Sequence, residues 1–120
     1  MAKVLVADDS ATAVALLQNA VSEAGHVSLV ATNGDDAMRL AVAEKPALIL
    51  LDVVMPKVDG FQVCRRLRKQ PETASTPIVI VTSKDQETDK FWGIRQGAND
   101  YITKPFEPKA LADLIRKHIG

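Results

Sequence analysis

The chain has 120 residues, and its 15 Lys and Arg residues are balanced by 15 Asp and Glu residues, so the formal net charge is zero. This length predicts one domain, residues 1–120, and the neutral balance argues against a nucleic acid or an anionic membrane as the partner. The single cysteine, Cys64, excludes an internal disulfide, and together with the lack of a signal peptide or a membrane-length apolar run it points to the cytoplasm.

The first predicted strand, at residues 3–7, ends on two adjacent acidic residues, Asp8 and Asp9. A helix is predicted at residues 12–24, where apolar residues recur every three or four positions, and Gly25 ends it. One of the two acids could cap this helix. Capping accounts for only one of them, and two neighbouring carboxylates repel one another.

A second strand is predicted at residues 26–32 and a second helix at residues 37–44, which Pro46 ends. The four aliphatic residues at 48–51 are too few for a helix and too apolar for a half-exposed strand. Such a run is typical of a central parallel strand that is covered on both faces. It ends on Asp52, which is either a helix N-cap or a functional carboxylate at the carboxyl end of the sheet.

The second half of the chain repeats the alternation of helix and strand. The predicted elements are a helix at 60–69, a strand at 78–81 that leads into Thr82 and Ser83, a helix at 85–96, a strand at 100–103 and a helix at 108–119. Cys64 is expected to be a small core residue. In the fourth helix, Phe91, Ile94 and Ala98 are expected to face inward. Trp92 is then partly exposed, either packed against a neighbouring helix or available to a partner.

Five strands alternating with five helices predict an α/β fold, a five-stranded parallel sheet with helices on both faces and the flavodoxin-like order 2-1-3-4-5. The first and third strands are neighbours in this order, so Asp8, Asp9 and Asp52 are expected to converge at one edge. Two carboxylates about 5 Å apart repel by roughly 3 kcal/mol at an effective dielectric of about 20. Three of them without a basic neighbour favour a hard cation, and Mg²⁺ is the expected cofactor.

Four motifs, DDS, LLDVVMPKVDG, IVIVTS and GANDYITKPF, follow one another along the chain. Their combination resembles the response-regulator receiver domain over the whole length, and within that family the stand-alone, CheY-like regulators. The segment at residues 82–93 is similar to receivers of the pilus chemotaxis systems that control twitching motility or phototaxis.

This resemblance implies a two-component switch in which Asp52 accepts a phosphoryl group from a histidine kinase. The implied Mg²⁺ ligands are Asp8, Asp9, Asp52 and the backbone carbonyl of Val54. The residues implied to contact the phosphoryl group or to respond to it are Thr82, Ser83, Lys104 and the aromatic switch Tyr101, with a cis peptide bond before Pro105.

Val54 and Lys84 are implied to set how long the phosphoryl group persists, because in the family these two positions influence the attacking water. Val54 has no donor or acceptor, and a charged Lys84 accepts no proton, so a long-lived phosphorylated state is expected. Simpler structural roles remain open for other residues: Thr82 as a strand-end cap, Lys104 as a solvated lysine and Tyr101 as a half-buried tyrosine with a hydrated hydroxyl.

The expected function is a switch that binds its target protein through the last two helices and the last strand in chemotaxis-like, pilus-based control of motility, and that is not an enzyme. A receiver that acts as a phosphate sink is a variant of this function. The alternative from another class is a Mg²⁺-dependent phosphatase with an aspartyl-phosphate intermediate. Phosphatases of the haloacid-dehalogenase type carry Asp-x-Asp after their first strand, whereas Asp8 and Asp9 are adjacent and no cap insertion is present.

Overall fold

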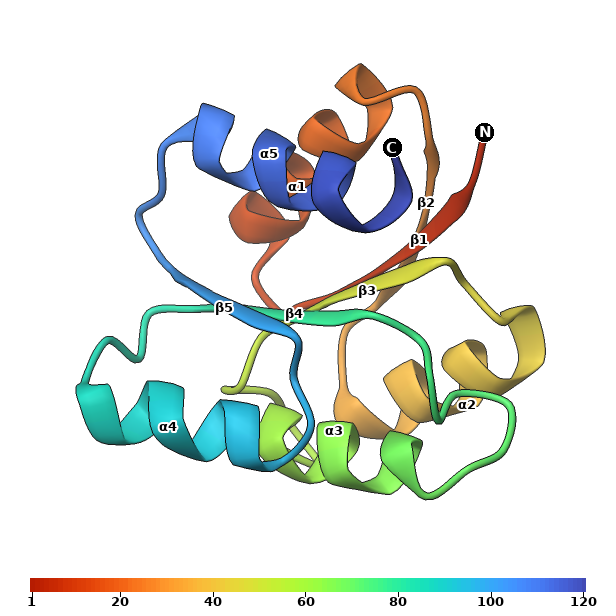
Figure 1. The fold of residues 1–120 in the computed structure, drawn as a ribbon, viewed down its shortest axis with the longest axis vertical. Coiled ribbons are helices and arrows are strands. Elements are labelled where there is room, and N and C mark those ends of the chain that lie inside the picture. The colour runs from red at the N-terminus through yellow and green to blue at the C-terminus, as the bar shows by residue number, and fades with distance from the viewer.

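The computed structural model describes residues 1–120, and its five strands form one parallel sheet in the order β2-β1-β3-β4-β5. The strands are β1 (Lys3–Ala7), β2 (Val27–Ala31), β3 (Leu48–Leu51), β4 (Ile78–Thr82) and β5 (Asp100–Thr103). Every neighbouring pair runs parallel. Figure 1 shows the alternation of strand and helix, and the predicted fold and strand order are confirmed.

Five helices cover the two faces of the sheet. They are α1 (Ala11–Glu23), α2 (Gly34–Glu44), α3 (Gly60–Arg68), α4 (Glu87–Arg95) and α5 (Pro108–Ile119). In Figure 1, α1 and α5 lie above the sheet, and α2, α3 and α4 lie below it. None of these helices combines the length and the apolar composition that crossing a bilayer requires.

Side chains alternate between two cores along each strand. Leu5 and Ile49 belong to the core shared with α2 and α3, whereas Val4 and Leu48 belong to the core shared with α1 and α5. Every residue of β3 and β4 is buried, as the sequence predicted for strands covered on both faces. These two strands therefore form a fixed base for the residues that follow them.

The helix N-termini are capped by residues other than the three acids at the strand ends. Side chains of Ser10, Asn33 and Asp59 accept backbone N–H groups at the starts of α1, α2 and α3. Because Asn33 caps it, α2 begins at Gly34, three residues before the predicted start. Capping therefore does not explain Asp8, Asp9 or Asp52.

The predicted inner face of α4 is wrong for two of its three residues. Phe91 and Ile94 are 62% and 49% exposed, and Trp92 is 50% exposed as predicted. The residue of α4 that is buried against the sheet is Gly93. Without a side chain at this position the helix lies close to the sheet, and its large apolar residues project outward.

Candidate functional site

The backbone of the sheet brings three acidic residues to one edge. β1 and β3 are paired with Ala7 opposite Leu51, so the residues after them lie next to one another. The N–H of Asp52 donates to the carbonyl of Ala7 at 2.9 Å, and the N–H of Asp8 donates to the carbonyl of Ala31 at 3.0 Å. These hydrogen bonds fix the two main chains just beyond the strands.

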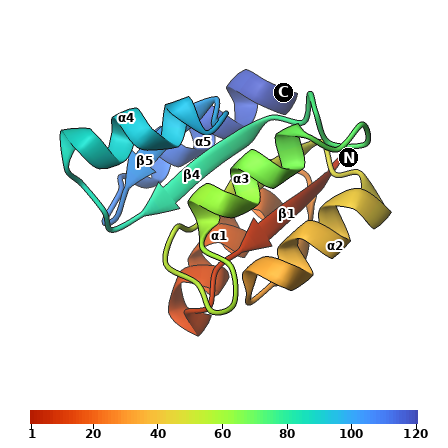
Figure 2. The ribbon, with the colours of Figure 1, turned by 90° about the horizontal axis from the view of Figure 1, so that it is seen from below.

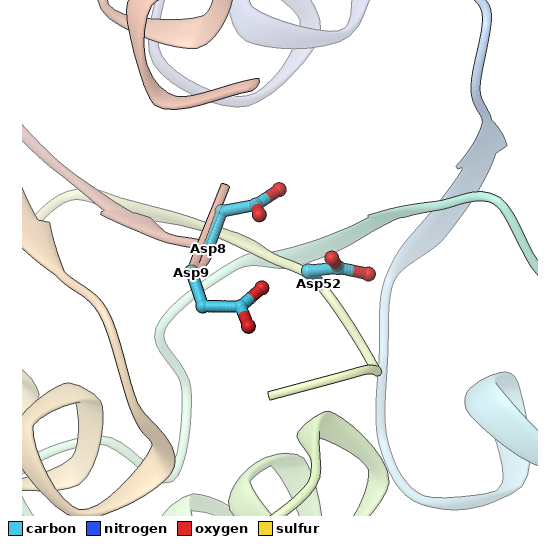
Figure 3. Close-up of side chains that lie close together, drawn as sticks. All are labelled: Asp8, Asp9 and Asp52. Carbon is cyan, nitrogen blue, oxygen red and sulfur yellow. The ribbon is translucent and has the colours of Figure 1, made fainter. Parts of the chain in front are cut away.

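The side chains of Asp8, Asp9 and Asp52 point into one space, as Figure 3 shows. Each offers a carboxylate oxygen, and the three oxygens lie within 4.8 Å of one another. Asp8 is completely buried, Asp52 is 7% exposed and Asp9 is exposed. The predicted convergence is confirmed, with Asp9 on the solvent side.

Lys104 is the basic neighbour that the argument from the first and third strands did not include. Its Nζ lies 2.6 Å from Oδ2 of Asp8 and 3.4 Å from Oδ2 of Asp52. Burial opposes the charge on Lys104, but the hydrogen bond that the ammonium donates to Asp8 and the nearby carboxylates outweigh this effect and raise the pKa of the ammonium. One cation faces three carboxylates, so the cluster keeps a net negative charge.

The main chain of Lys104 is positioned by the neighbouring strand. Its N–H donates to the carbonyl of Thr82 at 2.8 Å, which continues the pairing of β4 and β5 beyond the last residue of β5. The Lys104–Pro105 peptide bond is cis, as the resemblance implied. The lysine is therefore an anchored part of the site, and the alternative of a solvated lysine is wrong.

One oxygen of Asp52 is held by the backbone of the loop after β3. Oδ1 accepts the N–H of Val53 at 2.7 Å and that of Val54 at 3.4 Å, which leaves Oδ2 facing Lys104. Gly60, at the start of α3, packs directly against this loop. A Cβ at Gly60 would overlap the Asp52 carbonyl, so only glycine permits this close approach.

Thr82 on β4 and Tyr101 on β5 both contact Lys84, in the short loop that follows β4. Thr82 is completely buried, and its Oγ1 accepts the N–H of Lys84 at 3.5 Å. The hydroxyl of Tyr101 donates to the carbonyl of Lys84 at 2.8 Å. Burial, followed by the nearby carboxylates of Asp89, Asp52 and Asp85, raises the pKa of Tyr101 to about 12. This tyrosine is therefore hydrogen-bonded to the main chain.

Two further predicted site residues lie at the solvent side of the loop. Val54 is 54% exposed and Lys84 is exposed, and both line a shallow hollow with Met55, Asp59 and Phe61. Ser83, next to Lys84, is also exposed. The side chains of Val54 and Lys84 therefore share one solvent-facing hollow beside the loop that follows Asp52.

The two histidines have structural partners away from the cluster. Nδ1 of His26 accepts the N–H of Ala2 at 3.0 Å, and Nε2 of His118 lies 2.7 Å from the Asp100 carboxylate. Burial of Asp100 favours its neutral form, but hydrogen bonds from His118 and Lys117 outweigh this and hold the pKa of the carboxyl below its usual value. Neither histidine belongs to the candidate site.

The donor set of the cluster fits a divalent hard cation. Three carboxylates from two neighbouring strands offer oxygen ligands only, and their charge exceeds that of the nearby ammonium. Oxygen donors without sulfur or imidazole favour Mg²⁺ over Zn²⁺ or copper. The residues that could hold such an ion are Asp8, Asp9 and Asp52.

The chain matches curated proteins over nearly its whole length. It is 50% identical over 115 residues to protein PilH of Pseudomonas aeruginosa, which covers 96% of this chain and 95% of that protein. It is 46% identical over 107 residues to the transcriptional regulatory protein PhoP of Bacillus subtilis, but it spans only 44% of that longer protein.

Solved structures match the fold equally well. Chemotaxis protein CheY4 of Vibrio cholerae superposes with a TM-score of 0.91 at 30% identity over 99% of both chains. The receiver domain of a sensor histidine kinase from Pseudomonas aeruginosa, which holds a magnesium ion in its active-site cleft, superposes with a TM-score of 0.91 at 25% identity, over 99% of this chain and 98% of that one. The model of the response regulator receiver domain matches residues 4–116. The chain therefore belongs to the response regulator receiver domain family, the phospho-accepting switches of two-component signalling.

Proposed function

We propose that residues 1–120 form one receiver unit that is phosphorylated on Asp52 by a histidine kinase and then changes its affinity for a target protein. The observation that carries this proposal is the buried Asp52 carboxylate, which shares one space with Asp8 and Asp9 and has the Lys104 ammonium 3.4 Å from Oδ2. The protein would catalyse only its own phosphorylation and dephosphorylation, and would not turn over free substrates.

In the proposed reaction, Oδ2 of Asp52 attacks the phosphorus of a phosphohistidine. The new bond joins Oδ2 to phosphorus, the bond from phosphorus to the imidazole nitrogen breaks, and that nitrogen takes up a proton. Hydrogen bonds from Val53 and Val54 hold Oδ1, which keeps the attacking oxygen pointed away from the loop. Lys104 would then exchange its carboxylate contact for the phosphoryl oxygens.

Asp8, Asp9, Asp52 and the backbone carbonyl of Val54 would hold Mg²⁺ in this site. A bound ion would offset the negative charge of the transferring phosphoryl group. The fit of the three carboxylates supports this proposal, and a related receiver was solved with magnesium in its active-site cleft.

Thr82 and Ser83 would donate hydrogen bonds to the phosphoryl group, and Tyr101 would report the change. The contact of Thr82 with the Lys84 N–H and that of Tyr101 with the Lys84 carbonyl support this role, since both residues meet one loop residue. Movement of Thr82 toward the phosphoryl group would alter that loop and the position of the tyrosine.

We assign target binding to α4, β5 and α5, as the sequence suggested. Phe91, Trp92 and Ile94 expose large apolar side chains on α4, next to the loop that Tyr101 contacts. Exposed aromatic residues are frequent hot spots of protein interfaces. A target that packs on α4 would thus sense the state of the loop between β4 and α4.

The proposed pathway is chemotaxis-like control of pilus-based motility in the cytoplasm. The 50% identity to PilH over nearly the whole of both chains supports it. The unpaired thiol of Cys64 is compatible with a reducing compartment. In this pathway the chain would act either on a target protein or as a phosphate sink for a second receiver.

The proposal is tested by incubating the protein in Mg²⁺ with labelled acetyl phosphate and with a phosphorylated histidine kinase. One label per chain, absent from Asp52→Asn, is the expected result. Repeated hydrolysis of free phosphomonoesters without a stable label would instead support the Mg²⁺-dependent phosphatase. A phosphate sink would give a different result. The protein would accumulate label and bind no target, and it would remove label from a second receiver through the kinase that the two share.

A further inference from the structure

A groove lies between α2 and α3, away from the acidic cluster. Its volume is about 740 Å³, and its apolar lining comes from Met38, Val42 and Ala43, with the buried Leu67 beneath them. Figure 2 shows α2 and α3 side by side on the face that they share with α4. The lining residues belong to the middle and end of α2 and to the end of α3, whereas the phosphoacceptor loop meets the starts of these helices.

The charged residues that line this groove are all basic. They are Arg39 from α2, Arg66 near the end of α3 and Lys69 just after it. All three are exposed. In a chain with no formal net charge, this is a local concentration of positive charge over an apolar floor.

The partners of these cations leave most of their charge available. Arg39 lies 3.6 Å from Asp36 in a pair that is exposed to solvent, so water screens the attraction. Arg66 contacts the neutral side chain of Gln62 at 3.4 Å. By contrast, Arg68 on the same helix is committed to backbone carbonyls of Thr73, Thr76 and Gly97 and has a structural role.

The helix dipole explains part of this arrangement, because cations are favourable in the last turn of a helix. It accounts for Arg66 on α3. It does not account for Arg39, which lies in the middle of α2, nor for the apolar floor between the cations. The dipole alone therefore leaves the groove without an explanation.

We infer that the groove between α2 and α3 is a second docking site, which takes an acidic amphipathic helix from a partner protein. An apolar stripe on that helix would pack on Met38, Val42 and Ala43, and acidic residues beside the stripe would face Arg39, Arg66 and Lys69. Because the lining residues lie away from Asp52, binding is independent of phosphorylation. The site would hold the receiver near a partner in both states of the switch.

The test measures fluorescence anisotropy of a labelled helical peptide of about 18 residues, with leucine every three or four positions and glutamate on both flanks. We expect saturable binding that weakens as salt is raised. Combining Arg39→Glu with Arg66→Glu should raise the Kd by about tenfold, since two attractive charges become repulsive. The Kd should stay within about twofold of the wild-type value in Asp52→Asn and after treatment with acetyl phosphate and Mg²⁺.

Three controls make the outcome decisive. Lys90→Glu with Arg95→Glu changes the same number of charges on α4 and should leave the Kd unchanged. A peptide of the same composition with a scrambled stripe should bind at least tenfold more weakly. Melting curves should show that both double variants are folded.

No binding at about millimolar peptide, equal binding of the scrambled peptide, or equal loss in the α4 control would overturn the inference. The protein could instead sediment with phosphatidylserine vesicles, lose this binding in the Arg39→Glu/Arg66→Glu variant and bind no peptide. That result would identify a membrane site and also overturn the inference. Self-association of the protein in light scattering that is lost in the same double variant would overturn the inference as well. Because Asp52→Asn keeps the groove, loss of phosphorylation and loss of docking are separable results.

Discussion

Lys104 shows how a single residue can serve both the resting site and the proposed reaction. Its ammonium contacts the buried Asp8 and the proposed phosphoacceptor Asp52 at the same time. Oδ1 of Asp8 is held by the N–H of Ser10 at 2.9 Å, so Lys104 is the partner of the other oxygen. A fully buried carboxylate that loses its cation keeps the cost of its desolvation.

We therefore predict that Lys104→Ala lowers the free energy of unfolding by roughly 1–3 kcal/mol when a chelator removes divalent ions. Urea unfolding measures this change. In labelled acetyl phosphate, Lys104→Ala should also take up less phosphoryl label or show a smaller structural change when it is phosphorylated. Lys109→Ala is the matched control, because Lys109 pairs with the exposed Asp113 and should change stability by less than about 0.5 kcal/mol. Equal stability of the two variants would show that Lys104 does not compensate Asp8.

We propose that the lifetime of the phosphorylated state depends on two exposed side chains near Asp52, those of Val54 and Lys84. Val54 cannot orient an attacking water, and charged Lys84 can only donate. We predict that Val54→Asn combined with Lys84→Glu speeds loss of the label by roughly tenfold, or about 1.4 kcal/mol of barrier. Val54→Ala with Lys84→Ala is the control for simple access of water. A polar double variant that is no faster than this control would contradict the assignment.

Positions of the site residues could be predicted from the sequence because parallel strands end at the same edge. That argument placed Asp8, Asp9 and Asp52 at one location, and the structure confirms it, because one carboxylate oxygen of each lies within 4.8 Å of the other two. It could not give the contact between Lys104 and Asp8. Lys104 is distant from Asp8 in the sequence, and its choice between two adjacent carboxylates depends on side-chain rotamers that no hydrophobic pattern encodes.

Among the helices, α4 is the one whose buried face hydrophobic periodicity predicted wrongly. The pattern counted Phe91 and Ile94 as inward because large apolar residues usually face a core. The structure instead packs the helix through Gly93, which contributes nothing to an apolar pattern. A glycine inside a helix costs about 1 kcal/mol relative to alanine, so its presence signals a packing requirement rather than helix propensity.

The requirement at Gly93 is room for Tyr101. A Cβ at position 93 would lie 2.9 Å from Cδ1 of Ile80 and 3.0 Å from Cδ2 of the Tyr101 ring. We predict that Gly93→Ala displaces the tyrosine and lowers the melting temperature despite the better helix propensity of alanine. Thr88→Ala, at an exposed position of α4, should be neutral or slightly stabilising. Fluorescence of the neighbouring Trp92 reports the displacement, and an unchanged spectrum with a raised melting temperature would contradict this account.

At the scale of the whole molecule, the site exists only when the sheet is complete. Asp8 follows β1, Asp52 follows β3 and Lys104 follows β5, and they meet through pairings of strands that are distant in the chain. An unfolded chain does not gather these groups, so a ligand of the three carboxylates binds the folded state preferentially. Ligand binding and global stability are thereby linked.

We predict that Mg²⁺ raises the free energy of unfolding, by about 2.7 kcal/mol at a hundredfold excess over its dissociation constant. The variant Asp9→Asn distinguishes two effects on stability, the repulsion among the carboxylates and the binding of Mg²⁺. Asp9 is the exposed acid of the cluster, and the ammonium of Lys104 contacts the other two carboxylates. Without metal, Asp9→Asn should therefore be as stable as wild type or slightly more stable, because one repulsive charge is gone.

With Mg²⁺ present, wild type should be more stable than Asp9→Asn. Asp9→Asn has lost a ligand and should gain little, while wild type gains the full increment. Asp85→Asn removes an exposed acid from the loop before α4 and should respond to Mg²⁺ as wild type does. Thermal melts of the three proteins, each with chelator and with Mg²⁺, measure both effects. If the ion shifts Asp9→Asn as much as wild type, then it binds without Asp9, and the site is built from fewer carboxylates than the geometry indicates.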